Sequence, residues 1–508
     1  MPDTRSTARS AARYSVTLPI TGLTALLGCT LLLAWSTGDF ARKSVELLTV
    51  CGVVYAVSVL LISRLGWQHL RNLERLSMTD SLCGLPNRRA LHQDIMTRQD
   101  DVPEVALALL DLDGFKLVND IYGHFVGDRL LCRCAEIFEE IAAEHGRIYR
   151  LGGDEFAIVS AGRLAGTVLE GICYRIINRF ADPVMVGDRA ITLGASIGLS
   201  RSTPDARHGS PELLRRSDMA MYASKSNGKM RCTWYTPELD IRREEAQRLD
   251  EDMRRALPAG EFMIQYQPLV DARSGTIASV EALIRWNRAD GKPCGPDKFI
   301  PVAEESGFID TLGAWVLTEA CKTARDWDTI KLSINVSPAQ LRNPAFPTLL
   351  GQVLEDTGFP PERLELEITE THFVGDQKVV SRSLDMIRGF GVGVALDDFG
   401  SGYASIGFLR QFKFEKLKID RSLIVEAGEN KASRAMMASS IALARALDMR
   451  VTAEGIETQE QADFARTAGC DQMQGWLYSR AVPASEIQNH LDVGAILDAR
   501  VRAKRNVA

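Results

Sequence analysis

The feature that most constrains the fold is a regular alternation of apolar and helical stretches from residue 260 onward. Eight predicted strands follow one another along the chain: FMIQYQPLV, IASVEALIRW, IKLSINVS, LELEITE, GVALDDFG, KLKID, VTAEG and MQG. Helical stretches such as SRAMMASSIALARAL stand between many of them. Eight strand and helix units in about 240 residues are typical of a (β/α)₈ barrel, whose active site lies at the carboxyl ends of the strands. We therefore expect a barrel domain over residues 258–500.

Polar side chains recur at the ends of these predicted strands. They are Glu281, Asn335, Glu367, Asp397, Asp398, Lys418, Glu454 and Gln474. Any one of them, taken alone, fits a turn, a helix cap or the neutralisation of a core charge. Several carboxylates at one end of a closed barrel repel one another unless cations lie between them. The set therefore predicts a site for hard divalent cations.

A second α/β segment precedes the barrel, over residues 80–236, and a helical, Arg- and Glu-rich stretch at 237–257 predicts a linker. The stretch VALALLDLD predicts a buried strand that ends in carboxylates, with Asp111 and Asp113 on one face. A chain of 508 residues is too long for one ordinary domain, and its length predicts two or three packed units.

The stretch RLGGDEFAIV predicts a hairpin that has Gly152, Gly153, Asp154 and Glu155 at its tip. Taken alone, this tip is compatible with a solvated turn. If the hairpin lies beside the strand that ends at Asp111, carboxylates of both converge on an oxygen site suited to Mg²⁺ and a phosphate. The two glycines then let the backbone approach a nucleotide closely.

Two apolar stretches near the start contain no charged residue, at 16–35 and 47–63. Each is long enough to cross a hydrocarbon core of about 30 Å, and the first is longer than a signal peptide core usually is. Arginines before the first and after the second stretch outnumber the basic residues between them, which places both ends in the cytoplasm. We expect a cytoplasmic tail at 1–15 and a transmembrane hairpin at 16–63.

Leucines 65, 70, 73 and 76 predict a helical linker over 64–79, which either pairs with a second chain or packs on the next domain. The formal net charge of −6 argues against a nucleic-acid partner. The ten cysteines include no C-x-x-C pair, so neither a zinc ribbon nor a disulfide framework is indicated.

The first segment resembles the GGDEF domain of diguanylate cyclases, over roughly residues 76 to 236. Four motifs carry the resemblance: MTDSLCGLPNRRA, LLDLDGFKLVNDIYGHFVGD, RLGGDEFAIV and SDMAMYASKSNGK. The resemblance implies a palm-like α/β fold and the condensation of two GTP molecules, helped by metal, into cyclic di-GMP. Each domain would bind one GTP, which implies a homodimer.

The resemblance also assigns roles to residues. One or two Mg²⁺ or Mn²⁺ ions would be held by Asp111, the backbone carbonyl of Leu112 and Asp154, with Glu155 assisting. The remaining roles are guanine recognition by Asn119 and Asp128 and phosphate binding by Lys225 and Lys229. Three departures from the family pattern involve four residues: Lys229 replaces a common arginine, Ala143 and Gly146 replace the inhibitory product site, and Cys83 replaces a threonine. Feedback inhibition at that product site is therefore not expected.

The second segment is similar to the EAL domain of cyclic di-GMP phosphodiesterases, whose signature is Glu281, Ala282 and Leu283, extended by Arg285. The resemblance implies two Mg²⁺ or Mn²⁺ ions. The first would be held by Glu281, Asn335, Glu367 and Asp397, and the second by Asp397 and Asp398 with Glu454 nearby. Lys418 would orient the attacking water, and Glu370 would anchor the loop DDFGSGYASIGF. Substrate would be bound by Gln267, Arg285 and Gln474.

These observations predict a bacterial inner-membrane signalling enzyme that makes cyclic di-GMP from GTP at one site and hydrolyses it to pGpG at the other. Both catalytic domains are expected in the cytoplasm. Two alternatives remain open: a phosphodiesterase whose GGDEF domain only binds GTP and regulates, and a catalytically silent cyclic di-GMP receptor. A scaffold built from the membrane helices alone leaves the acidic residues unexplained.

Overall fold

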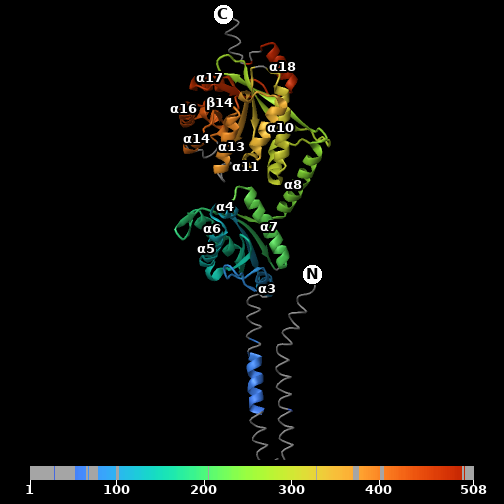
Figure 1. Ribbon diagram of the computed structural model, residues 1–508, viewed down its shortest axis with the longest axis vertical. Coiled ribbons are helices and arrows are strands. Elements are labelled where there is room, and N and C mark those ends of the chain that lie inside the picture. Colours follow the sequence, from blue (N-terminus) through green and yellow to red (C-terminus); the bar gives the residue numbers. More distant parts are fainter. Residues whose placement is uncertain are drawn as a thin grey trace, which may run out of the picture. The chain divides into compact units, whose positions relative to one another are not determined.

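The computed structural model describes residues 52–64, 78–98, 102–203, 205–327, 329–369, 377–400 and 406–494, together with residues 28, 67 and 497. The chain divides into two compact units, Met1–Asp240 and Ile241–Ala508 (Figure 1). Of the two predicted membrane spans, 16–35 lies outside the described residues apart from residue 28, and residues 52–63 of the second, 47–63, are helical. No helix among the described residues combines the length and apolar character needed to cross a bilayer. The leucine stripe also lies outside them.

A five-stranded sheet forms the centre of the first unit, with the strand order β2-β3-β1-β6-β7. Its strands are β1 (Val105–Asp113), β2 (Arg147–Gly152), β3 (Glu155–Ala161), β6 (Gly194–Ser202) and β7 (Cys232–Trp234). A separate ribbon pairs β4 (Val184–Val186) with β5 (Arg189–Ile191). The predicted strand 105–113 is therefore confirmed, and it lies between β3 and β6 at the middle of the sheet.

Helices cover both faces of this sheet. They are α3 (Arg88–Arg98), α4 (Phe115–Tyr122), α5 (His124–Ala142), the 3₁₀ turn η1 (Ala143–His145), α6 (Ala165–Phe180) and α7 (Ser210–Ser226). Alternate apolar residues of β1 enter two separate cores: Ala108 and Leu110 pack with residues of α5 and α6, and Leu107 and Leu109 with residues of α3 and α7. The strand is therefore buried on both faces and exposes only its carboxyl end.

The position of α7 depends on one glycine of β6. A Cβ atom at Gly198 would lie 1.9 Å from the backbone oxygen of Ser217 and 2.1 Å from the backbone nitrogen of Met221. Because both of these atoms belong to the α7 backbone, only glycine allows the helix to approach the sheet this closely. This approach places Lys225, near the end of α7, beside the carboxyl end of β1.

The second unit is a closed eight-stranded barrel, with the order β10-β11-β12-β13-β14-β15-β8-β9. Its strands are β8 (Phe262–Asp271), β9 (Ile277–Trp286), β10 (Lys331–Asn335), β11 (Leu364–Thr369), β12 (Gly393–Phe399), β13 (Lys416–Ile419), β14 (Arg450–Ala453) and β15 (Gln472–Gln474). All eight predicted strands are confirmed. The simple (β/α)₈ pattern is wrong in one respect, because β8 runs antiparallel to both β9 and β15. Only residues 272–276 join β8 to β9, which is too short a connection for a crossover helix.

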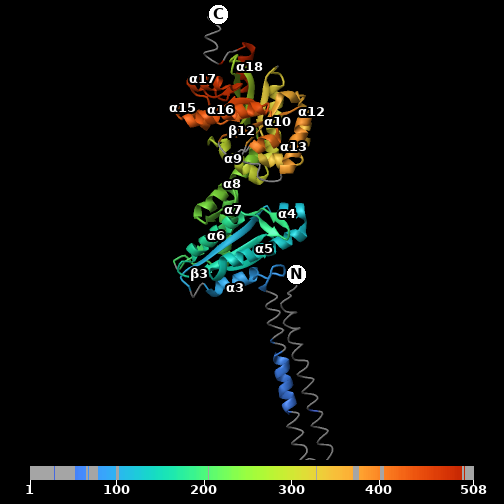
Figure 2. The ribbon, with the colours of Figure 1, turned by 90° about the vertical axis from the view of Figure 1, so that its left-hand side faces the viewer.

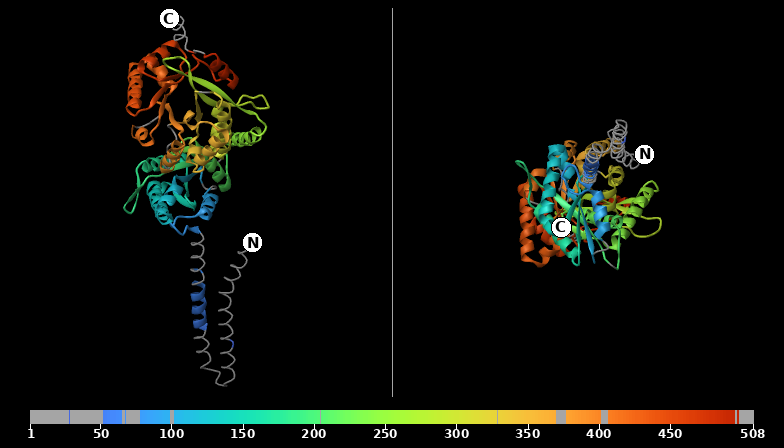
Figure 3. Two further views of the ribbon diagram at one scale, coloured as in Figure 1. Left: turned by 45° about the horizontal axis from the view of Figure 1, so that its top comes forward. Right: turned by 90° about the horizontal axis from the view of Figure 1, so that it is seen from below.

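Helices surround the strands of the second unit (Figure 2 and Figure 3). They are α9 (Pro296–Ser306), α10 (Ile309–Ala324), α11 (Pro338–Arg342), α12 (Phe346–Thr357), η2 (Pro361–Arg363), α13 (Gln377–Gly389), α14 (Ile406–Phe412), α15 (Arg421–Glu429), α16 (Lys431–Ala446), α17 (Gln459–Ala468) and α18 (Ala484–Asp492). The helix α8 (Pro237–Ala256) occupies the predicted linker.

The strands of the barrel place apolar side chains outward and polar side chains inward. In β11, Leu366 and Ile368 belong to the apolar core, whereas Glu365 and Glu367 alternate with them and are also buried. In β13, Leu417 and Ile419 alternate in the same way with Lys416 and Lys418. The sequences LELEIT and KLKI therefore fill the barrel interior with charged groups.

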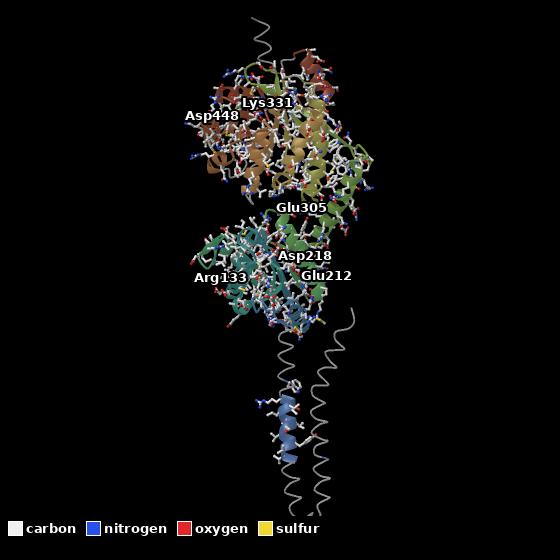
Figure 4. The ribbon with its side chains drawn as sticks, viewed as in Figure 1. Arg133, Glu212, Asp218, Glu305, Lys331 and Asp448 are labelled. Atoms are coloured by element: carbon white, nitrogen blue, oxygen red, sulfur yellow. The ribbon has the colours of Figure 1, made fainter. Side chains whose placement is uncertain are left out.

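Below the carboxyl ends of the strands, Glu365 and Lys416 form a buried ion pair, and both are at most 1% exposed. Ser333 donates a hydrogen bond to Glu365 at 3.2 Å, and the guanidinium of Arg450 lies 3.8 Å from its other oxygen. Burial raises the pKa of Glu365, but the charge and hydrogen bond of Lys416, together with the charges of Arg450 and Lys331, outweigh burial, and the pKa lies below its ordinary value. Lys331, labelled in Figure 4, begins the neighbouring strand β10.

Candidate active sites

The carboxyl ends of the barrel strands bring the predicted site residues together. The residues come from eight consecutive positions around the barrel: Gln267 from β8, Glu281 from β9, Asn335 from β10, Glu367 from β11, Asp397 from β12, Lys418 from β13, Glu454 just after β14 and Gln474 from β15. Because the strands close into a barrel, residues that are far apart in the sequence point into one concave mouth.

Lys418 lies at the centre of this group and is 1% exposed. Its ammonium is 2.6 Å from Glu454, 2.7 Å from Glu367, 3.3 Å from Asp397 and 3.7 Å from Glu281. Burial by itself lowers the pKa of Lys418, but the surrounding carboxylates outweigh burial and raise it well above its ordinary value. The single ammonium of Lys418 is thus shared by four carboxylates. The negative charge of these carboxylates exceeds that of one ammonium, which agrees with a site for further cations.

The carboxylate of Glu281 is held at both oxygens. Asn335 donates a hydrogen bond to one oxygen at 2.6 Å, and Gln474 donates to the other at 2.7 Å. Gln474 also donates to Gln267 at 3.1 Å, and Gln267 donates to the backbone oxygen of Ser479 at 3.2 Å. This chain of amides fixes the orientation of Glu281 and extends to the loop that follows β15.

Two consecutive acids of β12 contribute to the group. Carboxylate oxygens of Asp397, Asp398 and Glu454 all lie within 4.8 Å of one another, an arrangement able to hold a metal ion. The strand carries a register shift between Leu396 and Phe399, and Asp398 adopts the left-handed backbone conformation, with φ of 55°. Such a conformation is costly for a residue other than glycine and is typical of functional sites.

The protonation of these acids reflects their burial and crowding. Burial, followed by the charge of Asp397, raises the pKa of Asp398 to about 6. Burial is also the main reason that the pKa of Glu454 is raised to about 8, with the neighbouring acids adding to it. One carboxylate oxygen of Glu367 is buried without a hydrogen-bond partner. An unpaired buried oxygen within an all-oxygen donor set fits a hard divalent cation.

A cavity of about 460 Å³ adjoins this group on the side of β9 and β10. Its lining is mainly apolar and includes Leu283, Ile300 and Leu312, and it reaches the acidic group at Asn335. Arg285 also lines the cavity, where its guanidinium is held by Gln265 at 3.1 Å and by the backbone oxygen of Ile284 at 2.9 Å. Glu370 and residues 401–405 of the predicted anchoring loop lie outside the described residues.

In the first unit the structure brings the strand end and the hairpin tip together. Asp111 is paired in register with Glu155 across β1 and β3. Burial, followed by the charge of Asp111, raises the pKa of Asp154, so these two acids are close enough to interact. Lys225 forms an ion pair of 2.7 Å with Asp111. This lysine, predicted to bind phosphate, therefore stands where it can neutralise the acids in the absence of cations.

Arg150 holds the hairpin tip in place, a role that the sequence analysis did not identify. Its guanidinium donates to the backbone oxygen of Gly153 at 2.8 and 3.2 Å and to Asp80 at 2.8 Å. Gly152 and Gly153 have φ of 144° and 55°, and a Cβ atom at either would meet no atom within 4 Å. The tip is therefore fixed by the hydrogen bonds of Arg150, and the space beside its two glycines is open to a nucleotide.

The other residues predicted to contact the nucleotide do not gather around Asp111 and Asp154. The side-chain oxygen of Asn119 is buried without a hydrogen-bond partner and lies against Gly127 of α5. Asp128 lines a separate cavity of about 430 Å³. Lys229 has a left-handed backbone conformation, with φ of 61°, and within the described part of the chain its ammonium forms no ion pair with Asp111 or Asp154.

The fold and the two acidic sites define a two-domain α/β protein that has a sheet domain and a barrel domain, each with its own carboxylate cluster. Residues 77–231 match the diguanylate cyclase GGDEF domain, and residues 250–481 match the EAL domain. The chain belongs to the family of proteins that carry GGDEF and EAL domains in tandem.

Several known proteins match most of this chain. The bifunctional diguanylate cyclase/cyclic di-GMP phosphodiesterase MucR of Pseudomonas aeruginosa is 34% identical, over 82% of this chain and 62% of the relative. An uncharacterized protein of Mycobacterium bovis is 32% identical, over 82% of this chain and 68% of the relative. The S helix-GGDEF-EAL structure of Vibrio cholerae LapD, bound to c-di-GMP, shares the fold, with 19% identity, a TM-score of 0.52, and coverage of 80% of this chain and 98% of that one. The chain spans 51% to 62% of the length of the first three curated relatives that it matches.

Proposed function

We propose that the barrel domain hydrolyses cyclic di-GMP to the linear dinucleotide pGpG with the help of Mg²⁺ or Mn²⁺. The observation that carries the proposal is the ring of four carboxylates around Lys418, together with the cation-sized group formed by Asp397, Asp398 and Glu454. Nothing in the packing of a barrel requires so many acids at its mouth, and their crowding costs free energy unless cations bind there.

The residues of the barrel divide the work of hydrolysis. Cations at this site would supply a water of lowered pKa and neutralise the phosphate. The first would be held by Glu281, Asn335, Glu367 and Asp397, and the second by Asp397, Asp398 and Glu454. The Lys418 ammonium stabilises negative charge that develops on the phosphate. Gln267, Gln474 and Arg285 orient the substrate, and the cavity beside Asn335 has room for one of its bases.

For the GGDEF domain we propose synthesis of cyclic di-GMP from two GTP molecules, with metal held by Asp111, the carbonyl of Leu112 and Asp154. The pairing of Asp111 with the hairpin and the open tip at Gly153 support this proposal. One observation favours a regulatory GTP-binding role instead: Lys229 replaces a common arginine and makes no ion pair with these acids in the described residues.

We further propose that the apolar stretches at 16–35 and 47–63 anchor the chain in the bacterial inner membrane, with both catalytic domains in the cytoplasm and two chains associated as a dimer. The absence of charge in both stretches and the arginines that flank them support this proposal.

The experiment uses the purified full-length chain, incubated separately with cyclic di-GMP and with GTP in the presence of Mg²⁺. The expected products are pGpG and cyclic di-GMP, resolved by chromatography over time. Glu281→Gln keeps the size of the side chain but removes its charge, and it should abolish hydrolysis. Glu319→Gln, on the exposed face of α10, is the matched control and should leave the rate unchanged. Absence of pGpG from the unchanged chain would refute the barrel assignment, and a normal rate of GTP condensation in Asp154→Ala would refute the cyclase assignment.

A further inference from the structure

The turn that follows β10 sets the direction of Asn335. This residue is exposed at the barrel mouth, so close packing does not fix its amide. The amide nitrogen donates to Glu281 at 2.6 Å, which leaves the amide oxygen for a cation. The backbone nitrogen of Val336, the next residue, donates to the carbonyl oxygen of Glu367 at 2.9 Å. The turn therefore adjoins three of the residues proposed to hold the first cation.

A hydrogen-bonded cap fixes this turn. Ser337, two positions after Asn335, is the N-cap of α11. Its hydroxyl oxygen accepts a hydrogen bond from the backbone nitrogen of Ala339 at 3.1 Å, and its own backbone nitrogen donates to the side-chain oxygen of Gln340 at 3.1 Å. This reciprocal capping box sets the angle at which the chain leaves the strand.

One further hydrogen bond connects the cap to another helix. The Ser337 hydroxyl donates to a carboxylate oxygen of Glu304, in α9, at 2.6 Å. A short hydrogen bond to a charged acceptor is among the stronger ones in proteins. Glu304 forms no ion pair within the described part of the chain, so its contact with Ser337 is not a by-product of a charge network.

The cap is held from two helices. Glu304 and Ser337 line the same cavity as Asn335 and Gln340. Gln340 is 3% exposed, and a Cβ atom at Gly313 of α10 would lie 2.1 Å from its amide nitrogen. The cap is therefore packed closely against α10 and hydrogen-bonded to α9.

We infer that Glu304 is a positioning residue: through Ser337, it holds the turn that directs the Asn335 amide to the first proposed cation. This inference rests on the proposed metal-dependent function of the barrel. Without Glu304 the hydroxyl of Ser337 loses its acceptor, the cap loosens, and the Asn335 amide is free to turn away. Groups that orient metal ligands in this way typically account for ten- to one-hundred-fold in metal affinity.

The test measures Mg²⁺ affinity by calorimetric titration of the full-length chain. All variants carry Asp154→Ala, which removes the proposed metal site of the other unit, and the chain with this change alone is the parent. Glu304→Ala should weaken Mg²⁺ binding by roughly ten- to one-hundred-fold. Glu304→Gln keeps an oxygen acceptor for Ser337 and should bind Mg²⁺ nearly as well as the parent. Ser337→Ala should weaken binding, and adding Glu304→Ala to it should weaken binding no further, because both changes interrupt one path.

Asp310→Ala is the matched control. Asp310, in α10, accepts a hydrogen bond of 2.8 Å from Asn343, which follows the other end of α11. This change should lower the thermal stability in EDTA, as Glu304→Ala does, but should leave the Mg²⁺ affinity unchanged. The inference would be overturned by parental Mg²⁺ affinity in Glu304→Ala, or by a loss of affinity in Asp310→Ala or Glu304→Gln as large as that in Glu304→Ala.

Hydrolysis of cyclic di-GMP separates this inference from the proposed activity. A parent chain that binds Mg²⁺ without hydrolysing the dinucleotide would refute the activity, and weaker Mg²⁺ binding in Glu304→Ala would still support the positioning role. A parent chain that hydrolyses the dinucleotide, with the same Mg²⁺ affinity in Glu304→Ala, would support the activity and overturn the inference.

Discussion

Replacing Lys418 by methionine tests whether cations compensate the acids of the barrel. The side chain is nearly isosteric and remains apolar along its length, so the change removes one charge and little volume. Four carboxylates within 2.6 to 3.7 Å of the ammonium lose their shared partner. We expect the metal-free variant to be less stable and the variant with Mg²⁺ to recover most of the loss, because a dication replaces the missing charge.

The magnitude follows from the buried geometry. A pair of unit charges about 3 Å apart interacts by roughly 5 kcal/mol at an effective dielectric constant near 20. Loss of the hydration of Lys418 on burial offsets much of this attraction, and removing one partner of a buried pair typically costs about 3–5 kcal/mol. We expect a loss of that size without metal. Mg²⁺ at one hundred times its dissociation constant returns about 2.7 kcal/mol from one site, and two sites are available.

Lys416→Met is the matched control for this experiment. Lys416 lies two residues earlier on β13, is 0% exposed and pairs with Glu365, away from the proposed cations. Its removal should destabilise the barrel to the same extent with and without Mg²⁺. Scanning calorimetry of the full-length chain, in EDTA and at increasing Mg²⁺, measures the transition of the barrel in each variant. An equal Mg²⁺ response in Lys418→Met, Lys416→Met and the unchanged chain would refute the reasoning, because the carboxylates would then share no ion.

Three further predictions concern both units. Mg²⁺ should bind the barrel more weakly at pH 6 than at pH 8. The pKa of Glu454 is about 8 and that of Asp398 about 6, so at pH 6 the cation must displace protons from these carboxyl groups. Calorimetric titration at the two pH values measures the affinities, and equal affinities would contradict the prediction. Arg150→Ala should lower the stability of the first unit by about 3 kcal/mol, since three hydrogen bonds to Gly153 and Asp80 are lost; urea unfolding that matches the unchanged chain would speak against the clamp. Gly198→Ala should displace α7, destabilise the sheet by about 3 kcal/mol or more and reduce any GTP condensation. The control is Gly171→Ala on α6, where a Cβ atom meets no atom within 4 Å, and it should have none of these effects.

The architecture of the barrel could be predicted because apolar and charged residues alternate along the sequence of each strand. In LELEIT the leucines mark the outer face and the glutamates the inner face, and the same reasoning holds for KLKI. Closure into one barrel then follows from the number of strands, and closure brings their carboxyl ends together. The antiparallel β8 was missed because the stretch FMIQYQPLV has the same pattern in either direction, and only the short connection at 272–276 distinguishes the two.

Contacts between specific side chains could not be predicted in the same way. The sequence predicts that Lys416 and Lys418 both point into the barrel, because each alternates with an apolar residue in KLKI. It does not reveal that Lys418 contacts four acids whereas Lys416 contacts Glu365. Likewise, the sequence of the hairpin does not show that the guanidinium of Arg150 donates to the backbone oxygen of Gly153 and to Asp80, seventy residues earlier. Such partners depend on how strands that are distant in the sequence are staggered.

The left-handed residue Asp398 has a consequence for how the proposed cation sites depend on each other. In a regular strand, two neighbouring acids cannot serve the same cavity, yet the irregular backbone of β12 brings oxygens of Asp397 and Asp398 to the same group. A single peptide unit thereby sets the spacing of both proposed ions. Straightening that one unit would turn Asp398 away from Asp397, so the second proposed ion would lose a ligand and its shared edge with the first.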